Sequence, residues 1–165
     1  MAVFHRRRTQ IDGVVLDAGE RILASASGDT ESVVATDKRL LVPGSGGHHG
    51  IGWESVDRAT WDGDDQLLTI TQSTPPGFSP RQYRLRVEDA AQLLDVVREQ
   101  VTASMVISRY VLIEGTHGVR ISGRRQPGRA GLMWVVAVDK GLSIDAPSMR
   151  RQIEAAVARV RAEVE

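Results

Sequence analysis

The stretch over residues 31–72 constrains the fold of this chain more than any other. Short runs of β-branched residues and leucine are separated there by three turn signals, which are Asp37-Lys38, the glycines between positions 44 and 50, and Asp62-Gly63-Asp64. This spacing predicts an antiparallel meander. Because such short strands are unstable alone, the sheet must bend on itself and find a cover for its apolar face.

The flanking residues supply more strands and that cover. Residues 20–26, 67–70 and 83–87 have strand-like patterns, whereas apolar residues recur at near-helical spacing over residues 88–104. Ala90, Leu94, Val97 and Val101 share one face of the predicted helix. We therefore expect an amphipathic helix that closes the open sheet.

Residues 19–104 resemble the bacterial pleckstrin-homology-like (PH-like) domains. The similarity is carried by the ATDKRLLV hairpin and the GWESVDRATWDGDDQLLTI pair of strands, followed by one further strand and the helix. It implies a strongly bent antiparallel sheet or split barrel, capped by a helix, that binds peptides, lipids or other domains. Lipid-binding members have a basic first turn, whereas Gly28-Asp29-Thr30-Glu31 is acidic here. The whole chain is also similar to actinobacterial proteins of unknown function.

Residues 105–165 predict a three-stranded meander and a C-terminal helix packed on it. The run over residues 132–138 is apolar on both faces and is therefore expected to be the central strand. Asp145 is the expected N-cap of the helix, with Pro147 in its first turn. The predicted fold class is α+β, with an N-terminal arm (1–18), the PH-like part (19–104) and a βββα extension (105–165) packed with it as one unit.

Composition narrows the chemistry and the location. The chain has no cysteine, which excludes disulfides and thiolate metal sites. No run approaches the roughly 20 apolar residues of a membrane-spanning helix, and residues 1–13 do not have the pattern of a secretory signal. We therefore expect a cytoplasmic protein.

No motif for catalysis or cofactor binding is found. His48 and His49 lie among glycines without a third ligand at a defined spacing, which predicts an exposed turn and not a metal site. The carboxylates of the 62–65 turn lack the ligand spacing of a calcium loop. The sequence therefore predicts no enzyme, no cofactor and no metal.

Charge is distributed unevenly along the chain. Residues 1–104 contain 11 Lys+Arg against 15 Asp+Glu, whereas residues 105–165 contain 10 against 6, so the balances are −4 and +4. A candidate anion-binding face in the second half combines five arginines, of which Arg109 and Arg124 are expected to pair across two strands: Arg109, Arg120, Arg124, Arg125 and Arg129. The alternative is that Glu114, or carboxylates of the first half, neutralise these arginines internally.

Two function classes follow. The first is a non-enzymatic interaction module that receives a peptide segment or protein partner at a strand edge or beside a helix. The alternative is a protein that binds anions or nucleic acid through the arginines of the second half.

Overall fold

The computed structural model describes residues 13–73 and 80–165. It is an α+β structure with three antiparallel sheets and two α-helices among these residues. The predicted α+β class is therefore confirmed. Most of the predicted N-terminal arm lies outside the described residues.

The predicted meander forms two sheets. The first contains β1 (Ile22–Ser27), β2 (Ser32–Thr36), β3 (Arg39–Gly44) and β4 (Gly47–Gly52), and the second contains β5 (Val56–Asp62), β6 (Leu67–Gln72) and β7 (Arg81–Arg86). A single 3₁₀ turn, η1 (Trp53–Ser55), connects them. Neither sheet closes on itself within the described residues.

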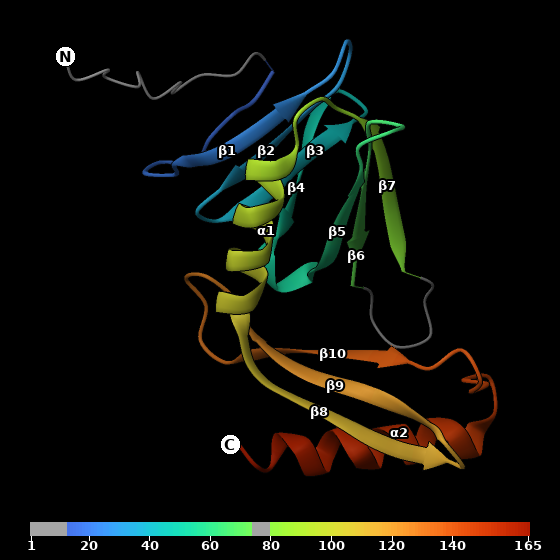
Figure 1. Ribbon diagram of the computed structural model, residues 1–165. Helices are drawn as coiled ribbons and strands as arrows, with labels where there is room; N and C mark the ends of the chain where they lie inside the picture. Colours follow the sequence, from blue (N-terminus) through green and yellow to red (C-terminus); the bar gives the residue numbers. More distant parts are fainter. Residues whose placement is uncertain (1–12, 74–79) are drawn as a thin grey trace.

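Helix α1 (Ala91–Ser104) covers the first two sheets, as predicted, and together they form the first part of the molecule (Figure 1). Leu93 and Val97 are buried on its inner face. Trp53 is 2% exposed in the same core, and its indole N–H donates to the Thr36 carbonyl at 2.9 Å. This bond satisfies the polar atom of the largest buried side chain and fixes η1 against β2.

The glycine-rich segment differs from the prediction of an exposed turn. Its second half is strand β4, in which His48 pairs with Pro43 and His49 pairs with Val42. His48 Nε2 lies 3.0 Å from the Ser32 carbonyl oxygen. Glycine tolerates the positive φ of Gly46 and Gly47, which confines the turn to the tip of the hairpin.

The second part contains β8 (Met105–Glu114), β9 (His117–Arg125), β10 (Leu132–Val138) and α2 (Pro147–Arg161), with the strand order β10-β9-β8. The prediction of a central β10 was wrong, because β9 pairs with both neighbours and leaves β10 at an edge. Ala146, not Asp145, is the N-cap residue of α2, and no side chain caps this end of the helix.

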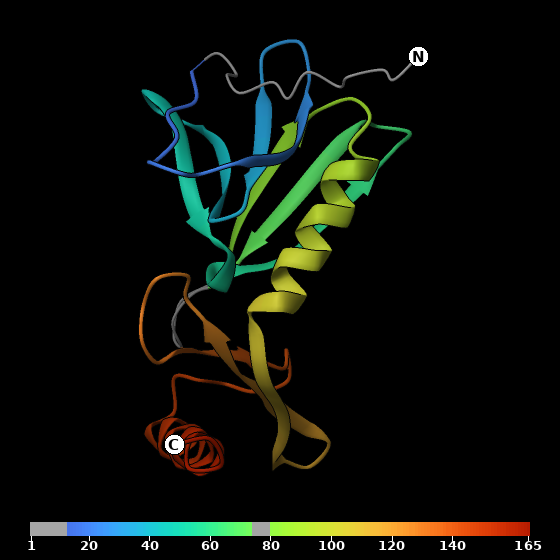
Figure 2. The ribbon, with the colours of Figure 1, turned by 90° about the vertical axis from the view of Figure 1, so that its left-hand side faces the viewer.

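Two separate hydrophobic cores result. One lies between the first two sheets and α1, and the other lies between the third sheet and α2. Figure 1 shows the two parts stacked end to end. Figure 2 shows that α1 continues directly into β8, since Ser104 ends the helix and Met105 begins the strand.

Candidate functional site

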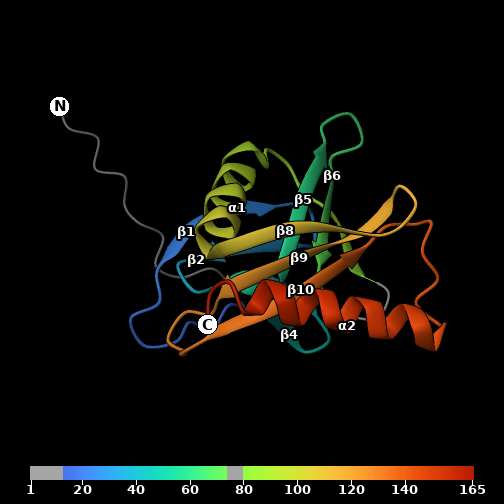
Figure 3. The same cartoon turned by 90° about the horizontal axis from the view of Figure 1, so that it is seen from below.

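Helix α2 does not cover its sheet evenly. It approaches β8 and β9 most closely, and it lies across the sheet when the molecule is viewed from below (Figure 3). Its buried stripe faces the second core and consists of Met149, Ile153, Ala156 and Val160. A neighbouring stripe, formed by Arg150, Glu154, Val157, Ala158 and Arg161, lines a space between α2 and β10. The edge strand is therefore incompletely covered.

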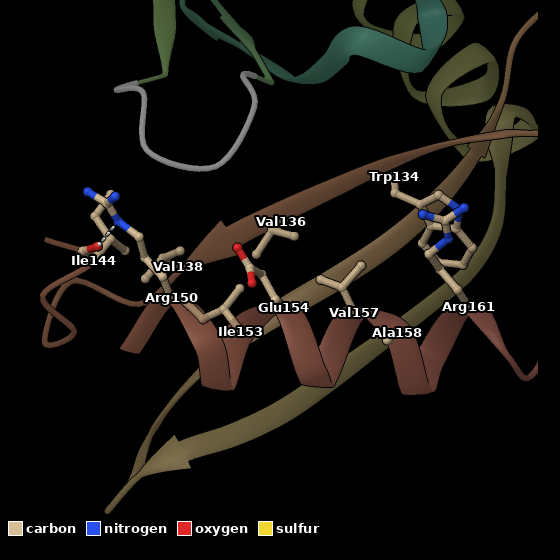
Figure 4. Close-up of a pocket in the computed structure, with 10 residues that line it drawn as sticks. All are labelled: Trp134, Val136, Val138, Ile144, Arg150, Ile153, Glu154, Val157, Ala158 and Arg161. Atoms are coloured by element: carbon tan, nitrogen blue, oxygen red, sulfur yellow. Dashed lines mark hydrogen bonds between the residues drawn. The ribbon is translucent and has the colours of Figure 1, made fainter. Parts of the chain in front are cut away.

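This space is a groove of about 600 Å³, which we call the β10–α2 groove (Figure 4). Trp134, Val136 and Val138 line it from β10, and Ile144 lines it from the segment before the helix. The strand and the helix run in opposite directions along it, so that Trp134 lies near Arg161 and Val138 lies near Arg150. The lining is mainly apolar, with three charged side chains contributed by α2.

Trp134 forms one end of the groove. A Cβ atom on Gly123 would lie 3.0 Å from its ring, so the absence of a side chain at Gly123 makes room for the indole. The Arg161 guanidinium lies over the Trp134 ring, 5.9 Å from the ring centroid. Cation–π attraction favours this arrangement. The indole Nε1 is buried and has no hydrogen-bond partner within the described part of the chain.

Strand β10 also offers unpaired backbone groups. The Asp139 N–H donates to the Gly118 carbonyl at 3.1 Å, and the β9–β10 register pairs Val138 with Val119. Because hydrogen-bonding directions alternate along an antiparallel strand, Trp134, Val136 and Val138 direct their N–H and C=O groups away from β9. No described strand pairs with this second edge. The same three residues therefore supply the free edge and the groove floor.

The three charged side chains of the groove differ in their contacts. Arg150 Nε donates to the Ile144 carbonyl at 3.1 Å, and Arg161 forms an exposed ion pair with Glu165 at 3.4 Å. Glu154 forms no ion pair with any residue that the structure describes. It projects from the middle of α2 toward Val136 (Figure 4).

The five predicted arginines do not share one face. Arg109 pairs with Ile121, not with Arg124, so that part of the prediction was wrong. Its guanidinium forms an ion pair with Glu163 at 3.0 Å, and Arg120 lies over the Tyr110 ring at 5.7 Å on the opposite face of the sheet. Arg125 and Arg129 are exposed. Anion binding by these four residues stays a prediction.

Arg124 is buried between the two parts of the molecule, with 3% of its surface exposed. It donates to the carbonyls of Val56 at 2.7 Å and Trp53 at 2.8 Å, and its Nε donates to the Ser104 hydroxyl at 3.0 Å. Burial lowers its pKa from the ordinary value, and the charges of Asp57 and Glu54 partly offset this effect. Arg124 therefore does not belong to an exposed anion-binding face.

A side-chain cluster holds the C-terminal end of β10 in place. The Tyr110 hydroxyl and the Gly118 N–H, the latter at 2.8 Å, both donate to Asp139 Oδ2. The hydrogen bond from Tyr110 lowers the pKa of Asp139 and raises that of Tyr110. These contacts connect the residue after β10 to the β8–β9 hairpin and so position the groove floor.

The sequence analysis did not single out the β10–α2 groove. One signal was available, because Arg150, Glu154, Val157, Ala158 and Arg161 recur at helical spacing beside the apolar stripe and form a second face. Across residues 13–73 and 80–165 no cluster of three or more His, Asp or Glu side chains is arranged for a metal ion. Neither described helix has the length and apolar character needed to cross a membrane.

Comparison with known proteins adds no relative to this description. No family model, no curated protein and no solved structure matches the chain.

Proposed function

We propose that this protein is a non-enzymatic interaction module that binds an extended peptide segment of a partner protein. The segment pairs with the free edge of β10 and places every second side chain in the β10–α2 groove. The observation that carries this proposal is the coincidence of an unpaired strand edge with an apolar groove lined by the same three residues, Trp134, Val136 and Val138.

Physical chemistry favours an extended occupant. An added strand satisfies backbone N–H and C=O groups along the edge, and alternate side chains of that strand point to one face of the sheet. In this protein that face is the groove floor, which is mainly apolar. The occupant is therefore a segment with apolar side chains at alternate positions.

The first part of the molecule takes a supporting role in this proposal. Its seven antiparallel strands followed by a covering helix support the resemblance of residues 19–104 to PH-like domains. We propose that this part holds β10 and α2 in place through Arg124 and through the continuous α1–β8 connection. The proposed binding site itself lies outside the PH-like part.

The test uses three fluorescein-labelled peptides of nine residues. Each has valine at odd positions and threonine at even positions, except that the fifth residue is lysine, glutamine or glutamate. We expect saturable binding of at least one peptide by fluorescence anisotropy. Val138→Pro removes an outward N–H without touching the β9 ladder, and it should weaken binding about tenfold. Val138→Thr, which keeps the N–H, is the matched control.

Two results would overturn this function. In the first, none of the three peptides binds. In the second, binding is equal in Val138→Pro and Val138→Thr, with circular dichroism showing that both are folded. Light scattering tests whether a second copy of this chain occupies the edge of β10 instead. A wild-type dimer that becomes a monomer in Val138→Pro would show that two copies pair through β10.

A further inference from the structure

We infer that the β10–α2 groove selects a segment with a basic side chain at its centre. This inference rests on the proposed function and adds the chemistry of the occupant. The residue that selects is Glu154, the one carboxylate among the described residues that line the groove.

The contacts of the three charged residues set this preference. Arg150 already donates to the Ile144 carbonyl, and Arg161 already lies over Trp134 and against Glu165. Glu154 lacks an ion-pair partner among the described residues and projects toward the middle of the groove floor. The charge at the centre of the groove is therefore negative, whereas the positive charges of Arg150 and Arg161 lie toward its two ends.

Spacing restricts the basic side chain to one position. At about 1.5 Å per helical residue, Glu154 lies roughly 6 Å along α2 from Arg150 and roughly 10 Å from Arg161. A bound strand advances about 3.3 Å per residue, so the groove-facing side chains two and four positions from the centre, at roughly 7 and 13 Å, flank the arginines. A basic residue is thus attracted at the centre and repelled at either end.

The form of a lysine or arginine side chain suits this position. Its aliphatic stem can cover Val136 and Val157 while its charged end reaches the Glu154 carboxylate at the rim. The second half of the chain has a charge balance of +4, from 10 basic and 6 acidic residues. The overall charge of this half favours acidic peptides, so a preference for lysine that depends on Glu154 indicates the local carboxylate.

The test compares the three peptides described above at low salt. The lysine peptide should bind about fivefold more tightly than the glutamine peptide, and the glutamate peptide should bind more weakly than both. A fourth peptide, with glutamine at the fifth position and lysine at the first, should lose the advantage of the central lysine. Raising the salt concentration should reduce these differences, because the pair is exposed.

Substitution of Glu154 provides the decisive comparison. Glu154→Lys should invert the preference, so that the glutamate peptide binds more tightly than the lysine peptide. The matched control is Glu163→Gln, which removes one negative charge from the C-terminal segment outside the groove and should leave the order unchanged.

The outcomes for the site and for its charge preference are separate. Peptides that bind in a Val138-dependent manner, but with equal affinity for lysine, glutamine and glutamate, would leave the proposed function standing and overturn the charge preference. A preference for lysine that persists in Glu154→Lys would also overturn it. Failure of all peptides to bind would instead reject the groove as a peptide site.

Discussion

Arg124 shows how much of the contact between the two parts depends on one side chain. Its guanidinium reaches from β9 to backbone carbonyls of η1 and β5, and no carboxylate forms an ion pair with it within the described residues. Backbone acceptors fix direction as well as distance, since a planar guanidinium donates in its own plane. Arg124 therefore sets the orientation of the third sheet against the first part.

Arg124→Ala should destabilise the protein by about 3 kcal/mol, because buried carbonyls lose their donor. For a chain of this size, that loss lowers the melting temperature by roughly 6–12 °C. Thermal unfolding followed by circular dichroism measures the change. Arg125→Ala, one residue away and exposed, is the control and should change the melting temperature by no more than about 2 °C. Equal effects of both substitutions would contradict this role for Arg124.

Glu20 predicts a pH dependence of stability. Burial raises its pKa, but hydrogen bonds from Arg39, the Asp17 N–H and Thr36 outweigh burial, so that the pKa is lowered from 4.5. Its stabilising effect is therefore complete above pH 4.5 and is lost as the pH falls through the lower folded-state pKa. Glu20→Gln should cost about 2–3 kcal/mol at pH 7 and flatten the decline of the unfolding free energy below pH 4.5.

Urea denaturation at pH 3.5, 4.5 and 7 measures this dependence. A wild-type protein and a Glu20→Gln variant with parallel acid profiles would show that Glu20 does not titrate in this range.

At the residue scale, the sequence predicted which face of β9 carries Arg124 but not its burial. Strand alternation gives a direction, whereas its partners are carbonyls far away in the sequence.

At the scale of single elements, Gly123 and Trp134 depend on each other. A methyl group at position 123 would lie 2.9 Å from Ile107 Cγ2 and 3.0 Å from the Trp134 ring. Gly123→Ala should therefore displace the indole, cost about 1–3 kcal/mol and weaken peptide binding. Gly44→Ala is the control, because its nearest atom would be His49 Cβ at 3.4 Å. Unchanged stability in Gly123→Ala would show that the ring moves without cost.

The same elements show where sequence patterns succeed and fail. The 31–72 meander was predictable because turn residues and alternation are local signals, and the ATDKRLLV hairpin forms as expected. The position of β10 was not predictable in this way. An apolar run indicates burial on two faces, but strand order depends on which neighbours pair, and β9 pairs on both sides.

At the scale of the whole molecule, the separate cores change the expectation for its two parts. The sequence predicted that the two parts pack as one unit, because residues 132–138 are apolar on both faces and the C-terminal helix can cover only one of them. Each part nevertheless has its own hydrophobic core. Residues 1–104 contain one complete core with its covering helix, so this fragment should fold cooperatively alone. Residues 105–165 have a smaller core and should not, because short chains bury too little surface.

Thermal melts and proton NMR spectra of the two fragments measure this difference. Dispersed amide signals and a cooperative melt are expected for the first fragment, and neither is expected for the second. Aggregation of the first fragment, or an independent fold of the second, would contradict the expectation. In the first fragment, the Trp53 and Val56 carbonyls that Arg124 contacts become accessible to water, which can replace the lost donor.

The direct passage from α1 into β8 restricts how this molecule could be recombined. No loop separates Ser104 from Met105, so a breakpoint there offers no slack to absorb a change of angle. A foreign domain fused in front of β8 would have to end in a helix and present acceptors to Arg124 where Trp53 and Val56 do now. The two parts are therefore unsuitable as interchangeable cassettes, and libraries built by domain shuffling should place their crossovers elsewhere.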